Sequence, residues 1–261
     1  MFRSLSTAAT GMEAQQTRLD VTAHNIANVS TNGYKKERAE FADLMYQTVV
    51  AAGSSTGNGT TAPSPTEIGL GVRLAATSRE NTQGSLHQTG NPLDVAIEGQ
   101  GYIPVTTPNG ETAYTRNGAL HMTAEGRLVN AEGYSIAGDI TIPSDATQVT
   151  IGADGTVSAV MPGESQAVEL GQIQIATFAN PGGLASLGGT LLRETNASGS
   201  AVIGAPGEGA AGTIRQGMLE VSNVNVVEEM IDLISGQRAY EINSRVIKAA
   251  DEMLGQTATL R

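Results

Sequence analysis

Apolar residues near the end of the chain recur at intervals of seven: Val226, Leu233, Tyr240, Ile247 and Leu254. Further apolar residues widen this row into a stripe: Met230, Ile234, Val246 and Met253. No proline interrupts residues 222–260, and helix-favouring side chains fill most other positions. The pattern predicts a helix over 222–260, with Ser222 or Asn223 as its N-cap. Because a seven-residue row drifts by about 20° per heptad, a helix that keeps it against a partner supercoils to the left.

A second row of the same period lies at the start of the chain: Leu5, Met12, Leu19 and Ile26. The Asn- and Gly-containing run at 28–33 predicts the end of this helix. We expect the two terminal helices to pair with each other and with neighbouring chains as a coiled coil. The alternative is two amphipathic helices packed on an ordinary core. Gln237 and the mid-helix Gly236 favour the first interpretation, since polar and small positions suit a helix surrounded by several others.

The middle of the chain has no helical period. Residues 34–52 fit either a short helix or a strand, and the Gly/Ser/Thr/Pro-rich run 53–65 predicts a flexible loop or linker. From Ile68 onward, short alternating runs are separated by turn dipeptides, which include Asn109-Gly110, Asn117-Gly118, Glu125-Gly126, Glu132-Gly133 and Asp154-Gly155. We therefore expect a fold that is mainly β with α termini, its middle an antiparallel sandwich or barrel.

The amino-acid composition and net charge of the chain argue against two classes of binding partner. The 261 residues include no cysteine and carry a net charge of -11, which argues against nucleic acid and against an anionic membrane surface. No run of eighteen apolar residues is present, so we expect no membrane insertion. The first twenty residues lack the apolar region of a secretory signal peptide, so we expect export, if it occurs, without signal cleavage.

Nothing in the sequence calls for an enzyme, a cofactor or a metal. The Gly-x-Gly-x-x-Gly pattern at 207–212 follows a loop and precedes a strand, whereas a dinucleotide site needs a strand before it and a helix after it. His24, His87 and His121 have no metal-ligand spacing. We predict no catalytic, cofactor-binding or metal-binding residue.

Several separated motifs resemble the bacterial flagellar rod and hook family. They are ANVSTNGYKK at 27–36, SNVNVVEEM at 222–230, QRAYEINS at 237–244, GQGYI at 99–103, YTRNGAL at 114–120 and GRLVNAEGY at 126–134. The residues that match the family at the two ends are Asn25, Asn28, Ser30, Thr31, Asn32, Gly33, Tyr34, Asn223, Asn225, Gln237, Arg238, Tyr240 and Asn243. At Tyr34, within this motif, and at Tyr102 and Leu120 the family often has phenylalanine, and these aromatic or apolar replacements leave the resemblance intact. Its length and the segment from Tyr46 to Arg73 are most similar to distal-rod members.

This resemblance implies a structural subunit that polymerises helically into the shaft carrying torque from motor to hook across the periplasm. It divides the chain into an N-terminal helix (1–33), a connecting segment (34–71), an outer β domain (72–221) and a C-terminal helix (222–261). The implied partners are other copies of the chain, proximal rod proteins, hook protein, the P- and L-ring bushing and the flagellar export apparatus. The assembly interface is predicted at Leu5, Met12, Leu19, Ile26, Val226, Met230, Leu233, Tyr240, Ile247 and Leu254.

Three alternatives remain open from the sequence. The chain resembles other axial proteins of the same family, of the proximal rod or the hook, so it could serve as one of those. A β-rich enzyme such as a cell-wall hydrolase, with a helical dimerisation hairpin, would show a cleft with perturbed carboxylates. A secreted adhesin-like binding module would show an exposed ligand groove in its β domain.

Overall fold

The computed structural model describes residues 2–57, 60–61, 63–138, 140–163 and 166–259. By its contacts the chain divides into two compact units. The helix–arm unit contains residues 1–26, 37–78 and 225–261, and the β unit contains residues 27–36 and 79–224. Both ends of the chain therefore belong to one unit, and the β unit is inserted between them.

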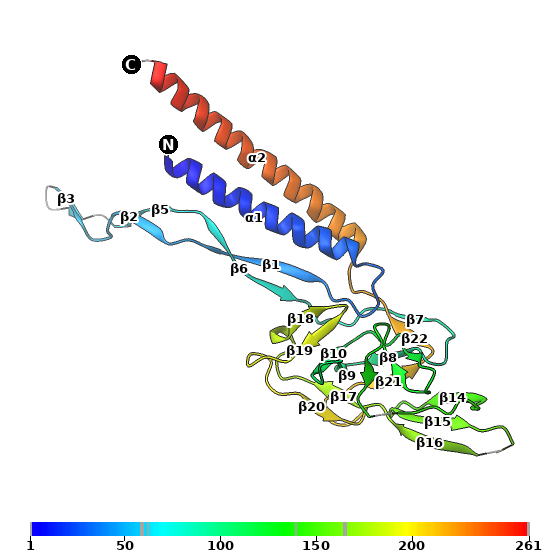
Figure 1. Ribbon diagram of the computed structural model, residues 1–261. Coiled ribbons are helices and arrows are strands. Elements are labelled where there is room, and N and C mark those ends of the chain that lie inside the picture. The colour runs from blue at the N-terminus through cyan, green and yellow to red at the C-terminus, as the bar shows by residue number, and fades with distance from the viewer. Residues whose placement is uncertain (1, 58–59, 62, 139, 164–165, 260–261) are drawn as a thin grey trace. The chain divides into compact units, whose positions relative to one another are not determined.

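Two helices form the longest elements of the helix–arm unit (Figure 1). Helix α1 spans Phe2–Ala27 and helix α2 spans Val226–Thr259. Helix α1 ends where the Asn/Gly run was expected to stop it. Helix α2 begins later than expected: Asn225 precedes it, and its side-chain oxygen accepts a hydrogen bond from the Val227 amide at 3.1 Å. The prediction of Ser222 or Asn223 as N-cap is therefore wrong.

The rest of the helix–arm unit is a long β-hairpin, here called the arm (residues 37–78). Its three successive antiparallel pairs are β1 (Glu37–Asp43) with β6 (Val72–Arg79), β2 (Tyr46–Val50) with β5 (Thr66–Gly69), and β3 (Ser55–Gly57) with β4 (Thr60–Thr61). The region 34–52 thus forms strands rather than a helix. The described part of 53–65, where a flexible loop or linker was expected, contains the short paired strands β3 and β4. Residues 58–59 and 62 lie outside the described residues.

The β unit is built from short antiparallel strands. Its seven-stranded sheet has the order β11 (His121–Met122), β12 (Leu128–Val129), β13 (Ser135–Ile136), β9 (Ile103–Thr106), β10 (Thr112–Thr115), β19 (Leu191–Arg193), β18 (Ala185–Gly188). A three-stranded sheet contains β14 (Gln148–Ile151), β15 (Thr156–Val160) and β16 (Ala167–Gln172). The antiparallel prediction is confirmed.

Three two-stranded ladders complete the β unit. Strand β17 (Ile175–Thr177) pairs with β20 (Val202–Gly204), and a short 3-10 turn, η1 (Pro181–Gly183), follows β17. Strand β7 (Leu86–Gln88) pairs with β22 (Met218–Glu220), and β8 (Val95–Glu98) pairs with β21 (Thr213–Gln216). The first strands of the unit are therefore completed by its last ones.

Most turn dipeptides behave as predicted, because their glycines have positive φ. Gly118 is the exception. Its φ is not positive, and a Cβ there would lie 1.7 Å from the Val95 carbonyl oxygen, so glycine serves a close backbone approach rather than a hairpin turn. The run Ile140–Pro143 forms no strand; Thr141 makes only an isolated bridge with Arg127.

The core of the β unit is aliphatic. Among the described residues, sixteen buried ones form its main cluster, and they include Val95, Ile97, Ile103, Val157 and Ile175. A smaller cluster places Phe178 edge-on against Tyr114 and Tyr102, with ring centroids 4.8 Å and 5.9 Å apart. The core of the β unit therefore needs few aromatic residues, because Val and Ile side chains from several strands fill its interior.

Candidate assembly surfaces and a buried ion network

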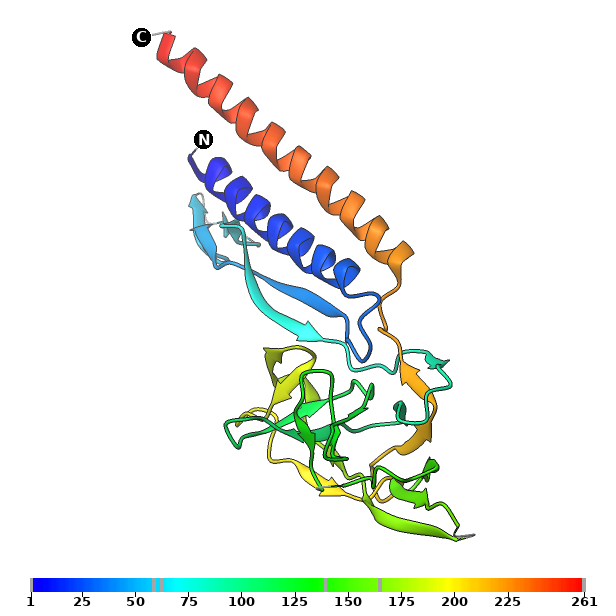
Figure 2. The ribbon, with the colours of Figure 1, turned by 45° about the vertical axis from the view of Figure 1, so that its right-hand side comes forward.

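The two helices pair within one chain. They run antiparallel and side by side in both ribbon views (Figures 1 and 2). Arg18 Nη2 donates to Asp232 Oδ1 at 2.8 Å across the pair. Glycine permits close approach on both helices, since a Cβ on Gly236 would lie 2.9 Å from Leu19 Cδ2 and one on Gly11 would lie 3.1 Å from Asn243 Nδ2. The pairing face is therefore partly polar and partly formed by small residues.

The predicted interface residues divide into two groups. Seven are half-buried: Leu5, Met12, Leu19, Ile26, Val226, Leu233 and Ile247. Met230 and Tyr240 are exposed, and the side chain of Leu254 lies outside the described residues. Within the chain, Leu19 is brought against α2 at Gly236, so part of the seven-residue pattern contributes to the intrachain pair.

A second apolar row of α2 faces away from α1. Val227, Ile231, Ile234 and Ile242 are each between 50% and 65% exposed. Their spacing of four, three and eight places them on one helical face, with Arg238 between the last two. Monomeric proteins rarely leave such a row in water, because exposed contiguous apolar surface marks an interaction site. This outer face of α2 is a candidate assembly surface.

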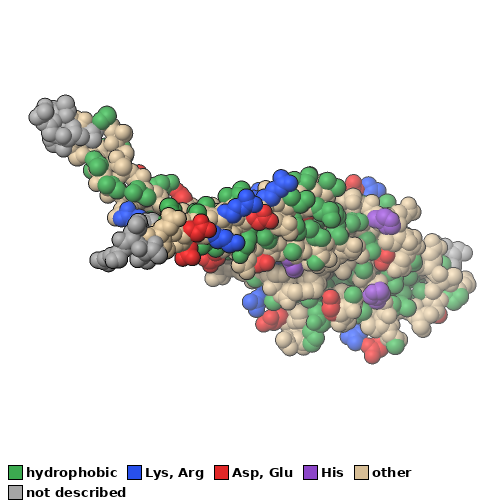
Figure 3. Space-filling model, turned by 90° about the horizontal axis from the view of Figure 1, so that it is seen from above, with side chains coloured by type: hydrophobic (Ala, Val, Ile, Leu, Met, Phe, Trp, Pro, Cys, Tyr) green, Lys and Arg blue, Asp and Glu red, His purple; other side chains and the backbone are tan. Residues whose placement is uncertain are grey.

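The arm carries a second apolar surface. Every residue of β2 is exposed, and Met45, Tyr46 and Val49 are 84%, 55% and 57% exposed. Hydrophobic side chains (green) also reach the surface elsewhere on the face that Figure 3 shows. An isolated two-stranded hairpin is at best marginally stable in water. The exposed apolar side chains of β2 make the arm a second candidate assembly surface.

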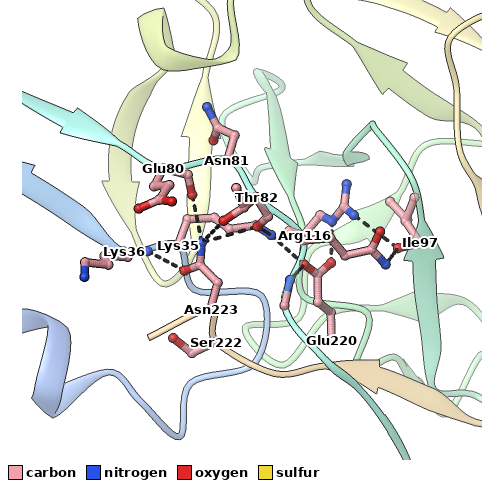
Figure 4. A network of polar contacts seen from close by, with 12 residues as sticks. Lys35, Lys36, Glu80, Asn81, Thr82, Ile97, Arg116, Glu220, Ser222 and Asn223 are labelled. Carbon is pink, nitrogen blue, oxygen red and sulfur yellow. Dashed lines mark hydrogen bonds and ion pairs between the residues drawn. The ribbon is translucent and has the colours of Figure 1, made fainter. Parts of the chain in front are cut away.

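The family-motif residues near the helix ends serve mainly as internal connections. Within the helix–arm unit, Asn25 hydrogen-bonds both to Glu37 and to Glu229. Within the β unit, Asn223 accepts a hydrogen bond from the Lys36 amide at 2.7 Å and donates to the Glu80 carbonyl oxygen at 3.0 Å (Figure 4).

The remaining motif residues divide between turns and the helix surface. The Asn28 side-chain oxygen accepts a hydrogen bond from the Thr31 hydroxyl at 3.1 Å. Ser30 is exposed, Thr31, Asn32 and Tyr34 are half-buried, and Gly33 is buried with φ +71°. Gln237, Arg238 and Tyr240 are exposed on α2. The motif residues therefore join backbone segments at the helix ends, and on α2 several of them are exposed.

A buried ion network lies in the β unit beside these connections (Figure 4). Glu220 of β22 accepts from Lys35 Nζ with one carboxylate oxygen and from Arg116 Nε with the other, each at 2.5 Å. The three side chains are 1%, 5% and 7% exposed for Glu220, Lys35 and Arg116. Glu220 also accepts a hydrogen bond from the Gly84 amide at 2.9 Å. One carboxylate thus joins four segments that are far apart in the sequence.

The polar groups of the two cations are satisfied as well. Arg116 donates further hydrogen bonds to the carbonyl oxygens of Ile97, Gly99 and Gly101, and Lys35 donates to that of Thr82 at 2.7 Å. Removing one member would strand the others in an apolar interior, which makes buried networks costly to break. The arrangement is therefore a structural clamp on the β unit.

The pKa values of Glu220 and Lys35, two members of the clamp, are both lowered, but for different reasons. Burial alone would raise the pKa of Glu220, but the positive charges of Arg116 and Lys35 and one hydrogen bond from each hold that pKa below its ordinary value. The pKa of Lys35 is lowered because burial removes its water, and Glu220 offsets only part of this effect while Arg116 adds to it. Two cations share one carboxylate, so the carboxylate is held charged more firmly than the lysine.

Sequence reasoning missed Lys35, Arg116 and Glu220. Lys35 and Arg116 stand inside the motifs ANVSTNGYKK and YTRNGAL, but a charged residue in a polar turn motif normally lies in water. Their burial depends on β22 bringing Glu220 back to the start of the unit through its ladder with β7. No local pattern carries that pairing.

A recess of about 570 Å³ lies in the β unit and is lined mainly by apolar residues, including Leu93, Met122, Ile142, Pro143 and Val149. None of its lining residues is ionisable, so this recess offers no acid–base pair. In the part of the chain that the structure describes, no three His, Cys, Asp or Glu side chains are grouped to hold a metal ion. Among the described residues, no helix has the length and hydropathy needed to cross a bilayer.

Comparison with known proteins links these features to a family. Three family models match: "Flagella basal body rod protein" over residues 5–35, "Flagellar hook protein FlgE/F/G D1 domain" over residues 96–159, and "Flagellar basal body rod FlgEFG protein C-terminal" over residues 215–260. The curated relatives include proteins named "Flagellar basal-body rod protein FlgG". That of Caulobacter vibrioides is 46% identical over the whole of both chains. That of Borreliella burgdorferi is 44% identical over this whole chain and 99% of its own, and that of Bacillus subtilis is 40% identical over both whole chains.

Proposed function

The chain belongs to the family of flagellar basal-body rod proteins as a structural subunit of the distal rod, and from this premise we propose how it assembles. The outer face of α2 packs against the terminal helices of neighbouring copies, and the helices of many copies form a coiled-coil core. The exposed apolar row of α2 is the observation that carries this proposal. Each isoleucine buried there contributes roughly 2 kcal/mol to association.

The geometry favours an open polymer over a closed dimer. The outer face of α2 and the apolar surface of the arm are different surfaces of one chain, and contacts between unlike surfaces of identical subunits continue indefinitely unless the rotation closes. Intrachain pairing of α1 with α2 leaves both surfaces free for neighbours. The arm then covers its exposed Met45 and Val49 on an adjacent copy and stiffens the rod.

We propose the more specific partners on the same basis. Family membership supports self-assembly and association with other basal-body components. Proximal rod proteins and hook protein would contact the two ends of the polymer, the P- and L-rings would surround it, and the flagellar export apparatus would deliver the chain. The relatives are structural rod proteins, so we assign the chain no catalytic role and set aside the hydrolase and adhesin hypotheses.

The direct test places charge on the outer face of α2. The double variant Ile231→Asp/Ile234→Asp should leave thermal unfolding of the β unit unchanged, because both side chains are exposed. It should abolish rods in electron micrographs of basal bodies and abolish swimming, since two carboxylates would enter an apolar interface.

The matched control is Lys248→Asp, which puts the same side chain on an exposed position of α2 that is already charged. The control should form rods. Rods of normal length from the double variant would refute packing through this face.

A further inference from the structure

Asn25 occupies the point where three elements of the helix–arm unit meet. Its side-chain oxygen accepts a hydrogen bond from the Glu37 amide at 2.9 Å, and its side-chain nitrogen donates to the Glu37 carbonyl oxygen at 2.8 Å. One carboxamide thus satisfies both backbone groups of the first residue of β1, as a neighbouring strand would. This fixes where the arm leaves α1.

The Asn25 side chain also contacts helix α2. The Asn25 nitrogen donates to Glu229 Oε2 of α2 at 3.1 Å, and Asn25 and Glu229 are each 1% exposed. Both amide hydrogens of Asn25 are therefore used, one by the arm and one by α2. Aspartate lacks the donor, and glutamine is longer by one methylene, so asparagine alone suits this triple contact.

A second contact holds the arm farther along α1. Val72, the first residue of β6, donates its amide hydrogen to Thr10 Oγ1 at 3.5 Å. Gly71 has φ +121°, and a Cβ there would lie 2.2 Å from that hydroxyl oxygen. Gly71 in turn accepts a hydrogen bond from the Leu44 amide at 2.9 Å. Thr10 and Asn25 are fifteen residues apart, or about 22 Å along the helix.

Strands β1 and β6 lie beside α1 in both ribbon views (Figures 1 and 2), so the two contacts hold the base of the arm along the helix. Beyond them, the apolar residues Met45, Tyr46 and Val49 are exposed. The direction in which these residues point is therefore set by α1, and α1 places Asn25 correctly only when it is helical.

We propose that Asn25 is a positioning residue that couples pairing of the terminal helices to presentation of the arm. Before α1 and α2 pair, the Asn25 side chain lacks its Glu229 acceptor, so it is held less firmly against Glu37 and the arm moves more freely. After they pair, the arm is directed at a neighbouring chain. The proposal rests on the assembly function above, and it orders assembly: helix pairing comes first, and arm contact follows.

The test measures backbone hydrogen exchange in assembled rods. In Asn25→Leu rods, exchange in residues 37–43 and 72–79 should rise at least about tenfold while α2 stays protected, because the opening is local. The matched control is Asn243→Leu, the same substitution at a helix–helix contact, where Asn243 of α2 faces Gly11 of α1. Its arm should exchange as in the wild type. Equal arm protection in Asn25→Leu and wild-type rods would overturn the proposal.

A milder variant keeps the test decisive if Asn25→Leu forms no rods. Thr10→Val removes the hydroxyl that accepts from the Val72 amide and donates to the Thr7 carbonyl oxygen. It should speed exchange at residues 44 and 72 while leaving residue 37 protected. Unchanged exchange at those amides would show that α1 does not hold the arm, and this result would also overturn the proposal. Failure of the wild-type chain to form rods would instead count against the assembly function itself.

Discussion

Gly236 of α2 lies directly against Leu19 of α1: a Cβ on Gly236 would be 2.9 Å from Leu19 Cδ2 and 3.4 Å from its Cγ. A mid-helix glycine costs about 1 kcal/mol relative to alanine. The close approach of α1 explains why that cost is tolerated here. The neighbour is a side chain of the same chain, so the glycine serves the intrachain pair.

Gly236→Leu should separate the helices and prevent rod formation, because four added carbons would overlap Leu19. Gly255→Leu is the matched control, since it makes the same change in the same helix where nothing lies within 4 Å. Swimming in soft agar and micrographs of basal bodies measure the outcome. Normal rods from Gly236→Leu would show that α1 and α2 separate on assembly.

Glu220→Gln should destabilise the β unit by about 3–5 kcal/mol, the range for breaking a buried ion network. Lys35 and Arg116 would each lose their charge partner while remaining buried. Denaturant unfolding of the full chain measures the change. Glu98→Gln provides the control, because the Arg215–Glu98 pair is about half exposed and such pairs contribute about 1 kcal/mol or less. Equal effects of the two substitutions would contradict the clamp.

The clamp should also be sensitive to acid. The pKa of Glu220 is lower in the folded chain than its ordinary value of 4.5, so the unfolded chain binds more protons as pH falls. The stabilisation is fully present above pH 4.5 and is lost as pH falls through the folded-state pKa. Thermal melts between about pH 6 and pH 3 should therefore show the wild type and Glu220→Gln converging in Tm. A constant difference in Tm would contradict this linkage.

Gly33→Ala should destabilise the β unit by about 2 kcal/mol or more. Gly33 has φ +71°, and a Cβ there would lie 2.6 Å from the Asn117 backbone nitrogen. Gly110→Ala is the control: its φ is +80°, but nothing lies within 4 Å, so it tests the backbone strain alone. Calorimetric unfolding should show the larger loss for Gly33→Ala. Equal losses would mean that Asn117 moves away without cost.

The double variant Met45→Ser/Val49→Ser should weaken rods without changing the stability of the free chain. Both side chains are more than half exposed within the chain, so removing them deletes little internal packing. If the arm is covered by a neighbour, the loss appears only in the polymer. Resistance of isolated rods to mild acid or heat measures it, with Thr48→Ser as the control. Rods as resistant as the wild type would show that this surface stays in water.

Local patterns in the sequence predicted the two terminal helices, most of the turns and the antiparallel strands. The seven-residue rows, and the Asn- and Gly-containing run at 28–33 that ends the first helix, each involve residues close together in the sequence. Residues 34–52 were ambiguous because the spacing of Phe41, Leu44, Met45 and Val49 fits a short helix whereas residues 46–50 fit a strand. Pairing of β2 with β5 shows that residues 46–50 form a strand. The motifs also identified the family, since they are properties of the chain itself.

Only the tertiary structure decided which of these residues meet. The α2 face that pairs with α1 contains Glu229, Gly236 and Asn243, whereas Val227 and Ile231 of α2 are left exposed. The clamp of Lys35, Arg116 and Glu220 and the triple contact of Asn25 join residues far apart along the chain. Local periodicity reports how one element divides into faces, but it carries no information on which distant element covers each face. That choice follows from satisfying buried polar groups and filling space throughout the folded chain.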